Sequence, residues 1–152
     1  MSSDEGTKNI NAIVIIEVLG RPPEHLVETL EDMTKKVGEE KGIRIINKKI
    51  NEPTLMKDQK DFYTCFTEIE LEAKEIFDLV ILMFKYMPAH IEILYPENIT
   101  LTNNGWGEAL NELTRRLHGY EEIARVLQSE RIILEKKLRE LTEGKKPQKK
   151  KK

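Results

Sequence analysis

Apolar and polar positions alternate in several segments of the first hundred residues, and these segments predict β-strands. Residues 12–19 are almost wholly apolar and rich in β-branched side chains, which is typical of a central strand covered on both faces. Residues 43–50 alternate weakly and suit a strand near an edge, whereas residues 61–73 alternate cleanly between two faces. Residues 90–95 form the fourth predicted strand, and residues 98–102 offer a further short one.

Two segments between these strands have the spacing of helices. After Pro23, which suits a first helical turn, apolar residues recur at intervals of four, three and four, at Leu26, Leu30, Met33 and Val37. This spacing predicts a helix with one apolar stripe facing the sheet. Residues 75–87 are apolar around most of a helix, which Pro88 ends, so this second helix needs cover beyond a single sheet face.

The order strand, helix, strand, strand, helix, strand is the split βαβ, or ferredoxin-like, order. The sequence therefore predicts an α+β fold with a ferredoxin-like βαββαβ antiparallel sheet over residues 11–104 and a long C-terminal α-helix over residues 105–143. Both shorter helices are expected on one face of the sheet, with Tyr95 pointing toward them. Strand alternation places a mixed set on the open face: Ile13, Ile15, Leu19, Phe62, Phe66 and Leu94, beside Glu17, Glu68, Glu70 and Glu92.

The apolar positions after residue 105 follow a heptad pattern. They recur at alternating intervals of four and three residues over five heptads, with Ala124 and Arg131 in two of the positions. The interface residues predicted from this seam are Trp106, Leu110, Leu113, Leu117, Tyr120, Leu127, Leu134, Leu138 and Leu141. Gly119 follows a basic turn and could end a helix, but the seam keeps its phase across it. The pattern favours one continuous helix.

The length of this helix predicts a partner. A helix of about 37 residues is about 55 Å long, nearly twice the span of a body of under a hundred residues. The leucines beyond Gly119 then need another helix, most simply that of a second chain, so we expect a homo-oligomer, in the simplest case a dimer. Arg131 would weaken that pairing or set its register. If the helix breaks at Gly119 instead, its two halves form a hairpin and a monomer suffices.

Composition and charge add expectations about location. The chain has 152 residues and a net charge of −2, but its last eight residues hold six lysines, which leaves −8 on the rest. A single cysteine and the absence of a secretion-type start predict a cytoplasmic protein. The longest apolar run is far too short to span a bilayer, so no membrane partner is expected. Residues 1–10 and 144–152 are expected to be a disordered lead and a disordered basic tail.

Few residue patterns suggest chemistry. The candidate metal ligands are the polar residues of the open sheet face, Glu17, Glu68, Glu70, His90 and Glu92. Their alternative is a solvated face that pairs with basic side chains. His118 and Glu122 are four residues apart, as surface pairs on helices are, and Cys65 is expected to be a buried thiol rather than a nucleophile. No catalytic residue and no cofactor are predicted.

The basic tail is the one segment suited to phosphates. Its lysines are the candidate nucleic-acid contacts: Lys145, Lys146, Lys149, Lys150, Lys151 and Lys152. Such a run would bind RNA or DNA without sequence preference and with strong salt dependence. The alternative is a solvated tail that only aids solubility.

The stretch IIEVLGRPPEHLVETLEDM, Ile15 to Met33, resembles the first strand, loop and helix of ACT-type regulatory modules. The resemblance implies a ferredoxin-like fold, side-by-side pairing, and a small-ligand site at the loop, which would place Gly20, Arg21 and His25 near the ligand. The whole chain also resembles small uncharacterised archaeal proteins.

These observations lead to one expectation about function and two alternatives. We expect a non-enzymatic, homo-oligomeric protein-interaction module that uses the C-terminal helix. The alternatives are an ACT-like domain that senses a small ligand and an accessory protein that contacts RNA or ribosomes through the tail.

Overall fold

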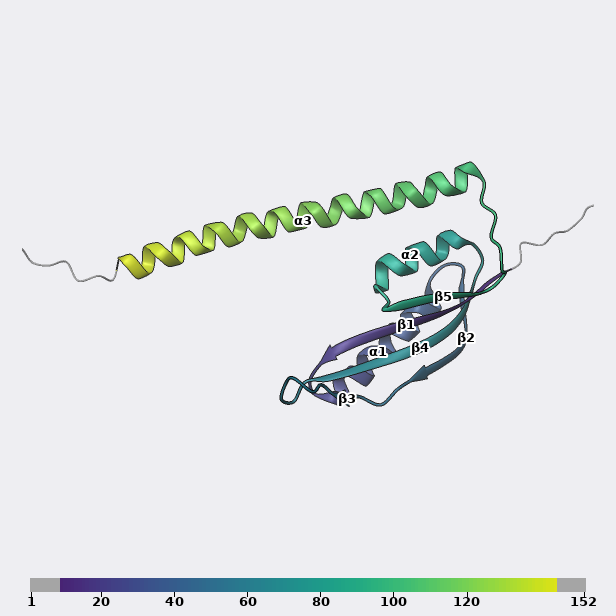
Figure 1. The fold of residues 1–152 in the computed structure, drawn as a ribbon, viewed down its shortest axis with the longest axis horizontal. Helices are drawn as coiled ribbons and strands as arrows, with labels where there is room; N and C mark the ends of the chain where they lie inside the picture. The colour runs from purple at the N-terminus through teal and green to yellow at the C-terminus, as the bar shows by residue number, and fades with distance from the viewer. Residues whose placement is uncertain (1–8, 145–152) are drawn as a thin grey trace, which may run out of the picture. The chain divides into compact units, whose positions relative to one another are not determined.

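The computed structural model describes residues 9–144 and divides the chain into two compact units, Met1–Ala109 and Leu110–Lys152. The first unit contains a sheet and two helices, and the second is formed by most of a long third helix (Figure 1). The elements are β1 (Ile10–Gly20), α1 (Pro23–Glu39), β2 (Ile43–Ile50), β3 (Thr54–Leu55), β4 (Tyr63–Ala73), α2 (Ile76–Tyr86), β5 (His90–Tyr95) and α3 (Asn103–Glu143). The protein is thus a mixed α+β fold with a long C-terminal helix.

The sheet has five strands, and every pairing in it is antiparallel. Its main path is β2-β4-β1-β5, and β3 extends the sheet by pairing with the beginning of β4. β1 and β4 pair along eleven residues each, from Ile10 opposite Ala73 to Gly20 opposite Tyr63. This long central pair fixes which side chains share a face, because a shift of one residue would turn every side chain over.

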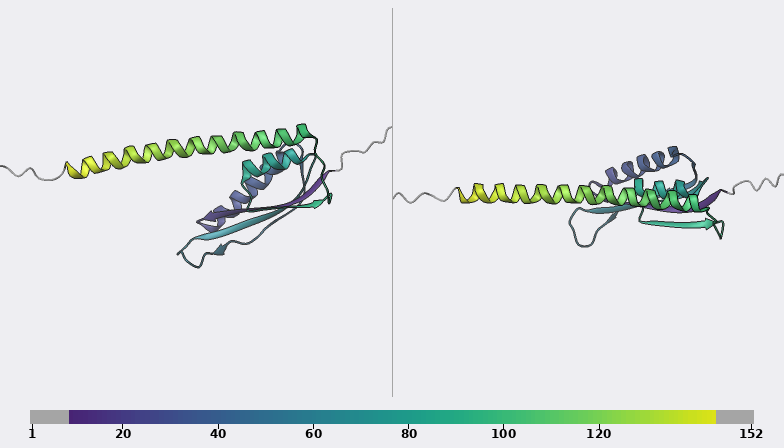
Figure 2. Two further views of the ribbon diagram at one scale, coloured as in Figure 1. Left: turned by 45° about the horizontal axis from the view of Figure 1, so that its top comes forward. Right: turned by 90° about the horizontal axis from the view of Figure 1, so that it is seen from above.

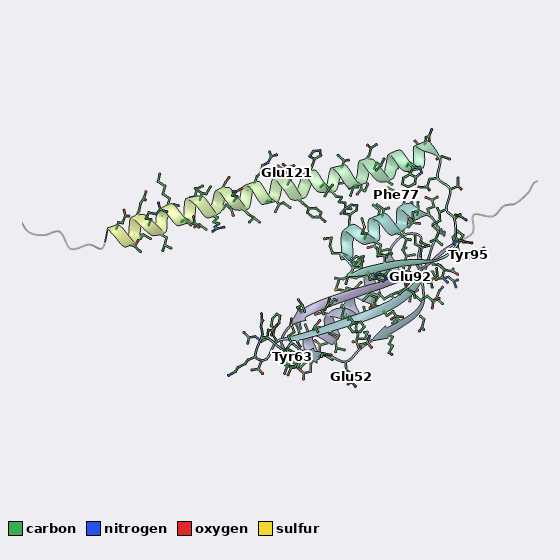
Figure 3. The ribbon with its side chains drawn as sticks, viewed as in Figure 1. Glu52, Tyr63, Phe77, Glu92, Tyr95 and Glu121 are labelled. Carbon is green, nitrogen blue, oxygen red and sulfur yellow. The ribbon has the colours of Figure 1, made fainter. Side chains whose placement is uncertain are left out.

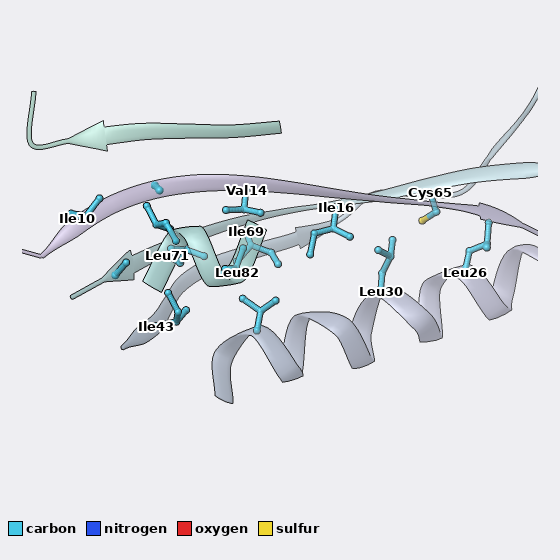
Figure 4. Packing of buried hydrophobic residues seen from close by; sticks show 14 residues of the cluster. Ile10, Val14, Ile16, Leu26, Leu30, Ile43, Cys65, Ile69, Leu71 and Leu82 are labelled. Carbon is cyan, nitrogen blue, oxygen red and sulfur yellow. The ribbon is translucent and has the colours of Figure 1, made fainter. Parts of the chain in front are cut away.

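The two shorter helices lie on one face of the sheet, as the alternation predicts (Figure 2). Figure 4 shows the core between them, where β1 and β4 direct their apolar side chains toward Leu26 and Leu30 of α1 and Leu82 of α2. Val14, Ile69 and Leu71 are fully buried there. Cys65 is buried in the same layer and its Sγ donates to the carbonyl of Asn51 at 3.1 Å. The prediction that the Cys65 thiol is buried is confirmed, and this burial raises its pKa.

Both outer strands of the sheet contain an irregularity. In β2 the register shifts between Ile45 and Asn47, and in the β1–β5 pair it shifts between Asn11 and Ala12. The second shift sets Tyr95 opposite Asn11, a residue of the open face, so the expected inward position of Tyr95 is wrong. A bulge adds one residue to a strand and reverses the alternation beyond it, and the sequence pattern does not show where it occurs.

One further expectation needs correction. Residues 98–102 form no strand, because the chain leaves the sheet at Pro96 and enters α3 at Asn103. The segment after Pro53 contains the two-residue strand β3, beside which the carbonyl of Phe62 accepts from the backbone N–H of Met56 at 2.8 Å.

Candidate interaction surface

The long helix α3 carries the main candidate surface. It runs for 41 residues without interruption through Gly119, where the heptad pattern keeps its phase. A side chain at Gly119 would meet no atom within 4 Å, so this glycine serves no close packing in the chain. No residue of α3 is buried. Figure 3 shows its side chains projecting around the whole helix, with Glu121 on a polar side.

All nine residues predicted for the seam are exposed, from 36% at Leu113 to 67% at Leu141. Their alternating spacing of four and three places them along one side of the helix. The stripe is apolar enough to need burial, because soluble monomers rarely expose continuous apolar patches of several hundred Å².

The apolar surface is wider in the middle of the helix than the heptads alone predict. Ile123, Val126 and Ile133 lie beside the seam and are each more than half exposed, as is Ile132 on its other side. The heptad pattern does not predict Ile123 and Val126, because neither residue occupies one of its seam positions. The spacing of three residues between them is the signal that places both on the same side of the helix.

The polar sides of α3 are occupied by ion pairs within the helix. The carboxylate of Glu112 accepts hydrogen bonds from Arg115 and from Arg116, the latter at 2.8 Å, and both cations lower the pKa of that carboxyl. Arg125 donates to Glu121 at 2.7 Å, and Arg131 donates to Glu135 at 2.9 Å. Several charged side chains of α3 therefore pair with one another at intervals of three and four residues.

Within residues 9–144, His118 forms no ion pair or hydrogen bond, so the expected surface pair with Glu122 is not formed. The neighbouring basic residues Arg115 and Arg116 turn to Glu112 instead. This cluster is part of the charged helix surface.

The strand order separates most of the candidate metal ligands of the open sheet face, although His90 Nε2 lies 3.9 Å from Glu92 Oε2. β1 lies between β4 and β5, so Ile13 separates Glu70 from Glu92 and Ile15 separates Glu68 from His90. Carboxylates two strands apart are about 10 Å apart, too far to share an ion. Glu17 accepts a hydrogen bond from Thr64 at 2.6 Å instead. No group of three or more ligating side chains that could hold a metal ion occurs in the described part of the chain.

The loop implied by the ACT resemblance is exposed at two of its three predicted residues. Arg21 and His25 are both exposed, and Gly20 adopts φ +153°, with the side chain of Leu26 3.3 Å from where a Cβ would lie. The carbonyl of Pro22 accepts from the backbone N–H of His25 at 3.2 Å, which starts α1. These contacts shape the turn between β1 and α1.

A hollow of about 410 Å³ lies elsewhere, where the end of α1 meets the start of α2. It is lined by Glu40, Lys41, Gly42, Lys74, Glu75, Phe77, Asp78, Ile81, Leu82 and Lys85. Asp78 and Glu75 form a capping box at the start of α2, in which the Asp78 carboxylate accepts from the backbone N–H of Glu75 at 3.1 Å. Sequence reasoning missed this site, although an acidic residue three positions after Glu75 is a signal for such a cap.

Glu40 joins the two helices at the rim of this hollow. Its carboxylate accepts from Lys85 Nζ at 2.9 Å and from the Tyr86 hydroxyl at 2.9 Å. The hydrogen bond from Lys85 lowers the pKa of Glu40, whereas burial and the adjacent Glu40 raise the pKa of Tyr86 to about 12. The contact spans more than forty residues of sequence, which is why no local pattern predicts it.

Replacing Glu40 by Gln is expected to lower the free energy of unfolding at pH 7 by about 1 kcal/mol, since the charged bonds to Lys85 and Tyr86 are lost. The folded-state pKa of Glu40 lies below its unfolded value of about 4.5, so this stability is present above pH 4.5 and disappears as the pH falls through the lower, folded-state value. Urea unfolding of both proteins at pH 7 and pH 3 measures it. The exposed Glu31→Gln change is the control, and an equal loss at both pH values would contradict the assignment.

The basic tail, Lys145–Lys152, lies outside the described residues. Among the residues that are described, no helix has the length and apolarity needed to cross a bilayer.

Comparison with known proteins gives one match. A family model described as the MJ0538 family matches residues 11–146, which cover the sheet, its helices and all of α3. No curated protein and no solved structure matches. Because the match spans both units, the long helix is part of the family's pattern rather than an addition to it.

Proposed function

The chain belongs to the MJ0538 family, and on that premise we propose that it acts as a non-enzymatic protein-interaction module that forms homodimers through α3. The single observation that carries the proposal is the exposed seam on α3, five heptads long and flanked by ion pairs that are already satisfied within the helix. A second copy of the same helix supplies a matching stripe and is always present at the concentration of the protein itself.

The energetics favour such a pairing. Full burial of a leucine side chain stabilises by about 1.5–3 kcal/mol, and six seam leucines beyond residue 112 are exposed by 36% or more on α3. About half of each of these side chains is exposed in one chain and can still be buried on pairing. Six leucines from each of two chains then contribute about 10 kcal/mol or more, before the entropy of association is subtracted. A dimer forms when this burial exceeds the cost of association, and micromolar binding needs a surplus of about 8 kcal/mol.

The proposal also includes a ferredoxin-like framework related to ACT-type modules. The strand order β2-β4-β1-β5 supports it, because the two helical crossovers each connect strands that are separated by one antiparallel neighbour. In that scheme β3 is an addition at the edge, and the fold serves to present α3.

We propose no catalytic activity because the reactive side chains named below are buried or held by neighbouring side chains. The Cys65 thiol is buried with a raised pKa, the Glu40 carboxylate is held by Lys85 and Tyr86, and Glu112 is held by two arginines. Each of these groups therefore has a structural role.

Solution mass tests the proposed dimer. We expect the full chain to have twice the mass of one chain at micromolar concentration, and a chain ending after Gln128 to have the mass of one, because the deletion removes Leu134, Leu138 and Leu141. A chain ending after Gly144 lacks only the basic tail and is the matched control, expected to remain dimeric. Light scattering that finds full-length and shortened chains equally monomeric would overturn the proposal.

The two other functions considered remain proposals that rest on the sequence. A small ligand would bind beside Gly20, Arg21 and His25, and nucleic acid would bind the six lysines of the tail. Neither receives added support from the geometry described above.

A further inference from the structure

We propose that two copies of α3 pair in antiparallel orientation, with Leu110 of one chain opposite Leu141 of the other and Arg131 packed on the Tyr120 ring of the second copy. The inference rests on the proposed function, since it specifies the orientation and register of the same pairing. It is argued from the size and charge of the residues that each orientation would bring together in the seam.

The seam consists of two alternating sets of heptad positions. The a set contains Leu110, Leu117, Ala124, Arg131 and Leu138, and the d set contains Leu113, Tyr120, Leu127, Leu134 and Leu141. A parallel, in-register pair sets each residue against its own copy. An antiparallel pair sets residues of the a set against residues of the d set.

Parallel pairing makes two poor layers. Arg131 would face Arg131 of the second copy, which brings two like charges into the seam, and Ala124 would face Ala124, which leaves space between the helices unfilled. Only the Leu127 layer separates these two layers, so both defects would lie near the middle of the paired segment.

Antiparallel pairing removes both defects in one register. With Leu110 opposite Leu141, the inner layers become Ala124 with Leu127 and Arg131 with Tyr120, each formed twice by symmetry. A small residue then meets a large one, which is how facing positions interdigitate in well-packed cores. The remaining layers join leucine to leucine: Leu113 with Leu138, and Leu117 with Leu134.

Arg131 is already arranged for such a layer. Its Nε donates to Glu135 Oε1 at 2.9 Å, so the guanidinium is held along the helix surface rather than directed across the seam. The aliphatic stem can then lie on an aromatic ring while the charged end stays in water.

The paired segment is long enough to form an interface. Its layers run from Leu110 to Leu141. A strip about 50 Å long and about 10 Å wide on each helix gives about 1,000 Å² in total, which reaches the range of specific protein interfaces.

Charges beside the seam discriminate less between the orientations. Parallel pairing brings Arg116 near Glu121 and Glu130 near Glu135 of the second copy, one attraction and one repulsion. Antiparallel pairing brings Arg116 near Lys137, a repulsion between long exposed side chains. Exposed pairs of this kind have small effects, so the layers inside the seam decide.

Cysteine cross-linking in the full chain tests the orientation. Leu113→Cys and Leu138→Cys are made in separate chains, and Cys65 is left in place because it is buried. After mild oxidation we expect a disulfide-linked dimer only when the two variants are mixed and refolded together, since residue 113 lies opposite residue 138 and about 37 Å from its own copy. Cross-linking of each variant with itself would show parallel pairing and overturn the inference.

A distance measurement provides a second test in case the substitutions Leu113→Cys and Leu138→Cys disturb the seam. A spin label on Glu143→Cys, at an exposed position on the outer side of the helix, should give a separation of about 50 Å between copies in antiparallel pairs and about 20 Å in parallel pairs. A mass of one chain for the full-length protein without cross-links would overturn the dimer itself. A dimeric mass with the short distance would overturn only the orientation.

Discussion

Replacing Leu127 by lysine should raise the dissociation constant of the α3 pair at least about 10³-fold and give the mass of a single chain at micromolar concentration. Leu127 lies near the middle of the seam and is 58% exposed in one chain. In a symmetric pair the change removes two buried leucines, each worth about 2 kcal/mol, and every 1.4 kcal/mol is a factor of ten in affinity. Two lysine charges directed at the partner add to the effect. Sedimentation equilibrium over a concentration series measures the constant.

The neighbouring Ser129 provides the matched control. It lies on the outer side of α3, away from the seam, and is exposed. Ser129→Lys adds the same charge two residues away, so we expect the dimer to persist with an affinity within a few-fold of the natural chain. Equal effects of the two lysines would mean that net charge, rather than the seam, controls association.

Replacing Gly42 by alanine should lower the free energy of unfolding by about 3 kcal/mol. Gly42 has φ +76°, a conformation that costs a residue with a side chain about 1–2 kcal/mol. The added Cβ would also lie 2.2 Å from Asp78 Oδ2, so Asp78 would have to leave the capping box of α2, which costs about 1 kcal/mol more. Urea unfolding followed by circular dichroism measures the loss.

Gly119 is the matched control for this change. It lies inside α3 with nothing within 4 Å of where a Cβ would lie, so Gly119→Ala should increase helix stability by up to about 1 kcal/mol. The same substitution is thus expected to act with opposite signs at the two positions. If Gly42→Ala were as harmless as Gly119→Ala, the close contact with Asp78 would not exist in solution.

Periodicity predicted those parts of the fold that depend on neighbours in sequence. The strict alternation of β4 and the four-three spacing of α1 are local patterns, and both elements form close to where they are expected. The continuity of α3 through Gly119 likewise follows from the unbroken heptad phase. Interactions between distant segments were not predictable in this way. The Glu40–Lys85 pair and the Gly42–Asp78 contact depend on how two helices end and begin against each other.

The same contrast between local patterns and contacts of distant segments applies to the candidate sites. The exposed seam on α3 could be read from the sequence, because a helix displays its own periodicity on its surface. On the acidic face, strand alternation gives the face of a residue but not its neighbours. β1 places Ile13 and Ile15 between the carboxylates, and only the strand order reveals that.

The irregular outer strands of the sheet also bear on aggregation through the sheet edges. An even row of free backbone groups at a sheet edge invites strands of other molecules to add, which leads to aggregates and fibrils. Here the β2 edge is interrupted after Ile45 and carries Lys48 and Lys49, and the β5 edge is interrupted beside Tyr95. These irregularities disfavour growth by strand addition at both edges of the sheet.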